Sequence, residues 1–167
     1  MKTAEYWIEK LHLQSHPEGG YFRETYRSIE TIRSDHLPQR FGRDRSFSTA
    51  IYYLLKGGQF SAFHRLKSDE IWHFYAGSSL TIYTIDRSGV LGPWKLGPNL
   101  EFGERFQVTI PATVWLAARC NDEKDYSLVG CTVAPGFDFN DLEFAKRQDL
   151  INKYPNYTEN INRLTHR

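Results

Sequence analysis

Two side chains that can exchange protons, His64 and Glu70, stand six positions apart in the chain. A polar turn at residues 67–69 separates them, and the stretch is bounded by Gly58 and Gly77. An unperturbed imidazole has a pKa of about 6.5 and can move protons at neutral pH, and carboxyl groups act beside it in general acid–base catalysis. The residue types therefore indicate proton-transfer chemistry, if two strands direct both side chains into one cavity.

The segments on either side of that turn have the pattern of β-strands. Side chains two residues apart share a face of a strand, so His64 would share its face with Phe60, and Glu70 with Trp72 and Phe74. A mainly apolar cavity with a few polar groups is the usual composition of a small-molecule site. We therefore expect these three aromatic residues to line a ligand pocket around the proton-transfer pair.

Short strand patterns fill most of the chain, and Gly or Pro separates most of them. Regular short strands with turn residues between them favour an all-β barrel or sandwich over alternating strand–helix units. Helical spacing of apolar residues predicts flanking helices at about 3–12 and 140–154, and residues 156–167 read as a polar, loose tail. We expect one domain over 1–167, with a barrel at about 21–134. The predicted strands are 21–28, 47–55, 60–66, 70–75, 79–85, 90–96, 105–110, 114–119 and 126–133.

Charged residues on the first predicted strand are further pocket candidates. Glu24 shares a face with Phe22, and it could be a pocket carboxylate or face solvent. Arg23, with the arginines of the polar loop at residues 29–45, could attract a phosphate or carboxylate through paired hydrogen bonds. A solvated loop explains those arginines equally well.

The composition excludes several classes of protein. A formal net charge of +1 gives no electrostatic case for nucleic-acid binding. No apolar run is long enough for a membrane span, and Glu5 and Glu9 interrupt the pattern that a signal peptide would need. Two cysteines are too few for a disulfide scaffold. We expect a cytoplasmic protein without membrane or nucleic-acid partners.

Longer motifs give the chain a specific likeness. They are HPEGGYF at 16–22, SDEIWHFYAG at 68–77, IPATVW at 110–115 and GCTVAPGFDF at 130–139. Together these motifs resemble the cupin subfamily known as DUF985 or Cupin_5, over roughly residues 7–155. The resemblance implies an RmlC-like jelly-roll barrel, also called a double-stranded β-helix, with a ligand pocket inside it, a homodimeric state and no agreed reaction.

The metal site of metal-binding cupins is incomplete in this sequence. His64 and Glu70 match two ligands of that site, whereas Leu66 and Leu116 stand at the positions of the other two histidines. Two protein ligands rarely hold a first-row ion, so we expect no metal cofactor. If an ion is bound, His64 and Glu70 would hold it, joined by His73 only if a β-bulge turned that ring inward.

Three functions remain open. The first is an enzyme that binds a small polar metabolite and epimerises or isomerises it with His64 and Glu70, while Trp115 stacks on a ring of the ligand. The second is a protein that binds such a metabolite without converting it. The third is a metal-dependent oxygenase or hydrolase. In the plainest alternative Glu70 only orients His64, or pairs with Arg65 or Arg23.

Overall fold

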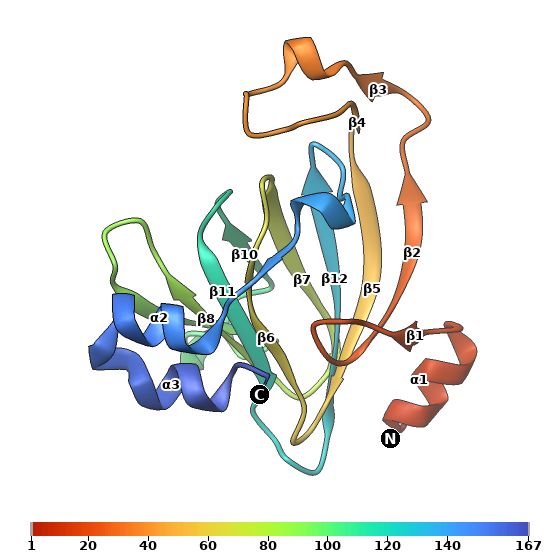
Figure 1. Cartoon of the computed structure of the whole chain (residues 1–167). Coiled ribbons are helices and arrows are strands. Elements are labelled where there is room, and N and C mark those ends of the chain that lie inside the picture. Colours follow the sequence, from red (N-terminus) through yellow and green to blue (C-terminus); the bar gives the residue numbers. More distant parts are fainter. Residues whose placement is uncertain (1, 167) are drawn as a thin grey trace.

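The computed structural model describes residues 2–166 and consists mainly of two antiparallel β-sheets (Figure 1). The larger sheet contains, in spatial order, β1 (Gln14–Ser15), β2 (Tyr21–Arg27), β5 (Thr49–Lys56), β12 (Tyr126–Ala134), β7 (Asp69–Gly77) and β10 (Gln107–Ile110). The smaller sheet contains β13 (Glu143–Phe144), β6 (Phe60–Arg65), β11 (Trp115–Cys120), β8 (Leu80–Ile85) and β9 (Leu91–Leu96).

The chain crosses between the two sheets repeatedly. β5 belongs to the larger sheet, β6 to the smaller, β7 to the larger and β8 to the smaller, and the crossing resumes from β9 to β12. Such crossing places the inner faces of the sheets against each other and is typical of a jelly-roll barrel. The predicted all-β double-stranded helix is therefore confirmed.

One half of the barrel is filled by a continuous apolar core. Tyr53 and Trp72 from the larger sheet meet Ile82 and Leu116 from the smaller one, and all four are almost completely buried. Their dense packing fills this half of the barrel with side chains.

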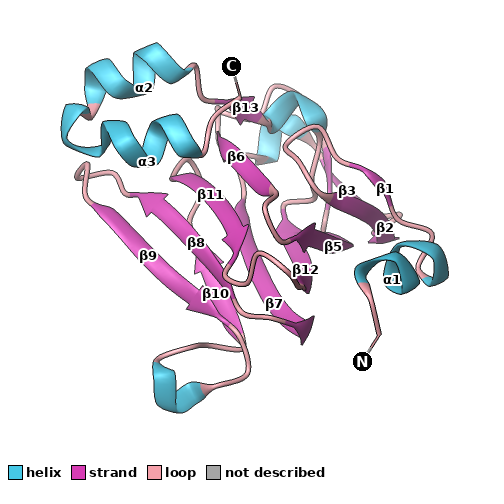
Figure 2. Cartoon of the chain, turned by 90° about the horizontal axis from the view of Figure 1, so that it is seen from below, coloured by secondary structure: helices cyan, strands magenta, loops and turns pink. Residues whose placement is uncertain are grey.

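Helices flank the sheets on different sides, as Figure 2 shows. α1 (Ala4–Lys10) packs near β1 and β2, whereas α2 (Arg147–Lys153) and α3 (Thr158–Arg163) lie together on the outer side of the smaller sheet. None of the helices in residues 2–166 has the length and apolar character that crossing a bilayer requires. Short 3-10 turns occur at Ser34–His36, Leu100–Phe102, Phe139–Asp141 and Pro155–Tyr157.

The C-terminal part of the chain differs from the sequence prediction. The predicted helix at 140–154 begins only at Arg147, because Glu143 and Phe144 form β13 and pair with β6. The tail expected to be loose contains α3, and Ile161 of this helix and Leu164 at its C-terminal cap are buried against the smaller sheet. These two residues lie three positions apart and therefore share one face of a helix, which gives the short polar segment an apolar contact.

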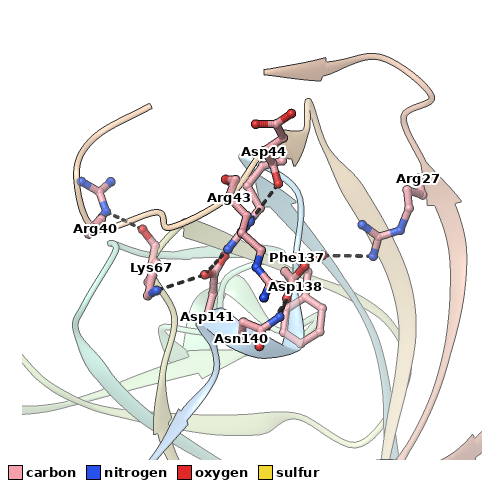
Figure 3. Close-up of polar contacts among 10 residues, drawn as sticks. Arg27, Arg40, Arg43, Asp44, Lys67, Phe137, Asp138, Asn140 and Asp141 are labelled. Carbon is pink, nitrogen blue, oxygen red and sulfur yellow. Dashed lines mark hydrogen bonds and ion pairs between the residues drawn. The ribbon is translucent and has the colours of Figure 1, made fainter. Parts of the chain in front are cut away.

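An arm between β2 and β5 projects beyond one end of the barrel (Figure 1). It contains β3 (Thr31–Ile32) paired with β4 (Arg45–Ser46). Buried Arg45 donates two hydrogen bonds of 2.6 Å to the carboxylate of Asp141 and two more to backbone carbonyls. The ammonium group of Lys67 lies 3.4 Å from the same carboxylate (Figure 3), so this group of charges ties the arm to the chain that follows β12.

Candidate functional site

A cavity of about 70 Å³ lies inside the barrel at the end from which the arm projects. A space of this size accommodates several water molecules or a small ligand. Its walls are apolar, and two charged residues, Glu24 and Arg27, lie at the edge of the larger sheet. Five more groups that can carry a proton also line it: His16, Glu18, His64, Glu70 and the thiol of Cys131. The apolar walls are formed by Phe22, Ile51, Leu66, Val133, Phe137 and Phe139.

His64 enters the cavity from β6, and its ring is almost completely buried. Its Nδ1 lies 2.7 Å from the carbonyl oxygen of Ala62. Because a carbonyl oxygen only accepts hydrogen bonds, Nδ1 must carry the hydrogen. The other ring nitrogen, Nε2, is therefore the one that can take part in proton transfer.

Glu18 faces that second nitrogen. Its Oε2 lies 3.2 Å from Nε2 of His64, and Glu18 is only 7% exposed. The sequence analysis did not identify this residue as part of the site. The signal that could have revealed it is the pair of glycines that follows, because Gly19 and Gly20 both adopt positive φ values, which glycine tolerates best.

The glycine turn brings Glu18 unusually close to β6. The amide of Ala62 donates a hydrogen bond of 2.8 Å to the carbonyl oxygen of Glu18. A Cβ atom at Gly19 would collide with the carbonyl oxygen of Phe60, so a side chain at this position is incompatible with the observed approach. The turn thus requires glycine for both its conformation and its packing.

His16, on the same turn, supports Glu18 from the other side. Its Nδ1 accepts a hydrogen bond of 3.2 Å from the amide of Glu18, and its ring packs edge-on against Phe22. Burial lowers the pKa of His16, with the charge of Glu18 acting in the opposite direction and that of His64 reinforcing the fall. We therefore treat His16 as a neutral imidazole with its hydrogen on Nε2.

Glu70 reaches the cavity from the first part of β7 and is 7% exposed. Trp72 donates an indole hydrogen bond of 2.8 Å to its Oε2. Burial raises the pKa of Glu70 to about 7, against the lowering effect of His64, and the negative charge of Glu18 adds to the rise. Near neutral pH this carboxyl group is consequently poised between its protonated and ionised forms.

A known protein family matches most of the chain. The family model Cupin_5, described as "Cupin superfamily (DUF985)", matches residues 5–145. The chain belongs to this family.

Relatives of this DUF985 cupin are similar along most of its length. It is 33% identical over 154 residues to the uncharacterised protein YML079W of Saccharomyces cerevisiae, covering 86% of this chain and 76% of the yeast protein. The crystal structure of protein SO0799 from Shewanella oneidensis is similar with a TM-score of 0.89 and 38% identity, covering 99% of both chains. A hypothetical protein from Leishmania major has a TM-score of 0.89 and 34% identity, covering 99% of this chain and 100% of the other.

The DUF985 cupin places some of the predicted pocket residues beside the cavity. Glu24 lines it and forms a bidentate ion pair with Arg27, which also donates to the carbonyl oxygen of Phe137 (Figure 3). Trp72 does not line the cavity but lies beneath it in the core and fixes Glu70. Phe74 shares the inward face of β7 as expected, but it packs at the other, filled half of the barrel.

The remaining predicted pocket residues lie outside the barrel. Pairing between β6 and β11 shifts by one residue between His64 and Ser61, and this bulge reverses the alternation of faces. Phe60 therefore packs in the outer cluster beneath α2 and α3, where Trp115 also lies. Arg23 is on the outer face of β2 and donates a hydrogen bond to the carbonyl oxygen of Leu11.

In residues 2–166 the side chains do not form the metal site of metal-binding cupins. Among residues 2–166 no three His, Cys, Asp or Glu side chains are grouped so that they could hold an ion. His73 lies on the outer face of β7, where its ring nitrogens contact Thr132 and Gln107. Leu66 and Leu116 present only apolar atoms to the interior. The residues present do not fit a bound ion, and a metal-free protein remains our prediction.

Proposed function

We propose that this cupin binds a small polar metabolite in its barrel and transfers a proton on it, as in an epimerisation or isomerisation. The observation that supports this function is the presence of His64 and Glu70 on the walls of one buried cavity. Buried ionisable groups are costly, and groups with displaced pKa values gather at functional sites. The pKa of Glu70 is raised to about 7, which is suited to a group that must give and regain a proton at neutral pH.

The proposed reaction requires a base and an acid. His64, through Nε2, removes a proton from a carbon next to a carbonyl group of the metabolite, and the electron pair of the broken C–H bond moves toward the carbonyl oxygen. Glu70 in its protonated form donates its proton to that oxygen. His64 then returns its proton to carbon while Glu70 takes a proton back from a hydroxyl group of the intermediate, which forms the carbonyl group of the product without an oxidant or reductant.

The size and walls of the cavity restrict the metabolite. A volume of about 70 Å³ favours a compact molecule. Aromatic rings of Phe22 and Phe137 provide flat apolar surfaces, while the Glu24–Arg27 pair supplies polar contacts. We therefore expect a short carbon chain with polar groups rather than a bulky nucleotide conjugate.

Mass spectrometry of the protein under native conditions can identify a metabolite that is retained through purification. The same compound is then incubated with the protein in D2O, and deuterium at the carbon next to its carbonyl group is measured. We expect incorporation by the wild-type protein and its loss in His64→Gln. His36→Gln removes an exposed imidazole that does not line the cavity and serves as the matched control. Full incorporation by His64→Gln would exclude the proposed base.

A protein that only binds the metabolite is the second candidate. One observation favours it: both ring nitrogens of His64 already have protein partners, Ala62 and Glu18. Such a paired imidazole could simply recognise a ligand. Saturable binding without any deuterium incorporation would support this candidate.

We also propose that the protein is a cytoplasmic homodimer. Tyr26 and Tyr75 expose more than half of their surface on the outer side of the larger sheet, where α2 and α3 do not reach. The two cysteines, Cys120 and Cys131, are buried as free thiols, which suits a reducing compartment. Light scattering that gives the 19.5 kDa mass of one chain would contradict the dimer, and fractionation of cells tests the location.

A further inference from the structure

We propose that Glu18 is a further catalytic residue, which shares one proton with His64 and acts with it as a single proton-accepting unit. The inference rests on the proposed proton transfer. It assigns a role to the HPEGG motif, which carries Glu18 into the cavity.

The first support is the geometry of the two side chains. Oε2 of Glu18 and Nε2 of His64 are 3.2 Å apart, and the only other ring nitrogen donates to Ala62. Without a proton between them, a lone pair of Oε2 and the lone pair of Nε2 would face each other away from solvent, which is unfavourable. One proton must therefore lie between the two atoms. Because an imidazole is ordinarily the stronger base, we place it on Nε2 beside an ionised Glu18.

The second support is that the backbone holds both partners at a fixed separation. Ala62 accepts a hydrogen bond from the ring of His64 through its carbonyl oxygen and donates one to the carbonyl oxygen of Glu18 through its amide. Tyr53, in the rigid core, donates a hydrogen bond of 2.7 Å to the carbonyl oxygen of Gly19. Such fixation is the kind of preorganisation that catalytic groups require.

The third support is the separation of Glu70 from this pair. Among the described residues His64 forms its ion pair with Glu18, and no hydrogen bond or ion pair joins it to Glu70. Glu70 has its own partner in the indole of Trp72. The cavity thus holds two proton-carrying groups with different hydrogen-bond partners, the Glu18–His64 pair and the Glu70 carboxyl group, whose charges act on each other.

These two groups complete a balanced isomerisation. Because Nε2 of His64 already carries a proton, the carboxylate of Glu18 takes over the role of base and accepts the proton from the carbon next to the substrate carbonyl, while His64 keeps its own proton and holds the carboxyl group in place. The electron pair of the C–H bond forms the C=C bond of an enediol, and Glu70 protonates the former carbonyl oxygen. Glu18 then returns its proton to the neighbouring carbon as Glu70 recovers one from the second hydroxyl group.

The resting proton can be tested without a ligand, by nitrogen-15 NMR of the imidazole rings. We expect a protonated Nε2 in His64 of the wild-type protein and an unprotonated Nε2 in Glu18→Gln, because a neutral amide no longer stabilises the imidazolium ion. Glu143→Gln, which removes an exposed carboxylate that pairs with Arg65, should leave the signal unchanged. The inference would be overturned if Nε2 of His64 were unprotonated in the wild type. It would also be overturned if Nε2 stayed protonated in Glu18→Gln.

The catalytic role is tested by deuterium incorporation from D2O into a set of short-chain aldoses and ketoses. Glu18→Gln should lower kcat at least ~10²-fold with little change in KM, which is the effect expected for a general base. Glu143→Gln again serves as the control. Loss of incorporation in His64→Gln together with normal kcat in Glu18→Gln would reject Glu18 and leave the proposed function standing. No incorporation by the wild type would reject proton transfer on these compounds, and the nitrogen spectrum alone would then decide whether the pair shares a proton.

Discussion

Two groups of buried charges in this protein differ in how completely they are paired. At the base of the arm, Arg45 and Asp141 satisfy each other through two hydrogen bonds, and carbonyl groups and Lys67 complete the set. Beside the cavity, Glu18 and Glu70 are equally buried but border free space. The group around Arg45 is therefore structural, whereas the carboxyl groups of Glu18 and Glu70 border the cavity and can contact a ligand there.

The difference shows which property separates a structural charge from a candidate functional one. Both groups are buried, and in both a carboxylate lies beside a basic side chain. What differs is the cavity, together with the carboxyl group of Glu70, whose pKa is raised by burial. Four substitutions test this difference between the two groups.

Asp141→Ala should have the largest effect on stability. It leaves the guanidinium group of Arg45 buried without its carboxylate, and removing one partner of a buried pair typically costs about 3–5 kcal/mol. Urea denaturation of the two proteins measures this loss. A change below about 1 kcal/mol would show that water reaches Arg45 and that the arm is not held by this pair.

Glu70→Gln should change how stability depends on pH. The folded pKa of about 7 lies above the ordinary value of 4.5, so the folded protein keeps a proton that the unfolded chain has released. The contribution of Glu70 to the free energy of unfolding is therefore fully present below pH 4.5. It is lost as the pH rises toward 7 and through it, which lowers the stability by up to about 3 kcal/mol. The variant is always neutral and should lack this decline.

Denaturation series of wild type and Glu70→Gln on both sides of this pH window provide the measurement. His64, Glu18 and Cys131 face Glu70 and remain in both proteins, so the difference between the series isolates the carboxyl group. Parallel curves for the two proteins would mean that Glu70 titrates in the same range in the folded and unfolded chains.

Gly19→Ala should disturb the cavity group through the backbone. The residue adopts a φ of +113°, and the added Cβ would meet the carbonyl oxygen of Phe60. We expect a loss of about 1–3 kcal/mol and the displacement of Glu18. Gly58→Ala is the control, because Gly58 also has a positive φ but its Cβ would enter open space. Equal losses in both variants would indicate that only the backbone conformation matters.

Glu143→Gln should have the smallest effect. The pair that Glu143 forms with Arg65 is exposed, and exposed ion pairs contribute between zero and about 1 kcal/mol. Thermal denaturation should give nearly the same Tm for variant and wild type. A large drop would show that the short pairing of β13 with β6 depends on this carboxylate.

The sequence was sufficient to predict the fold and the two strands that carry His64 and Glu70. Their alternating pattern and the turn between them are local features, and local features can be read from neighbouring residues. The position of Phe60 could not be predicted in this way, because a single bulge in β6 reverses its face. No residue type in that segment requires a bulge.

Glu18 shows a different limit. Its place beside His64 depends on contacts between segments more than forty positions apart in the chain. The two glycines marked a special turn, yet nothing in the turn itself shows which strand it approaches. Similarly, the apolar pair Ile161 and Leu164 is too short a pattern to establish α3 without the sheet on which it packs.

The segment that follows α2 supports the strand that carries His64. The amide of Phe63 donates a hydrogen bond of 2.7 Å to the carbonyl oxygen of Leu164, and Nε2 of His166 lies 3.4 Å from the carbonyl oxygen of Glu18. No residue from 158 to 166 lines the cavity. Random mutagenesis scored by the proposed proton transfer should nevertheless recover clones with changes in this segment that lose the signal, and these residues would be mistaken for ligand contacts unless the stability of each variant were measured separately.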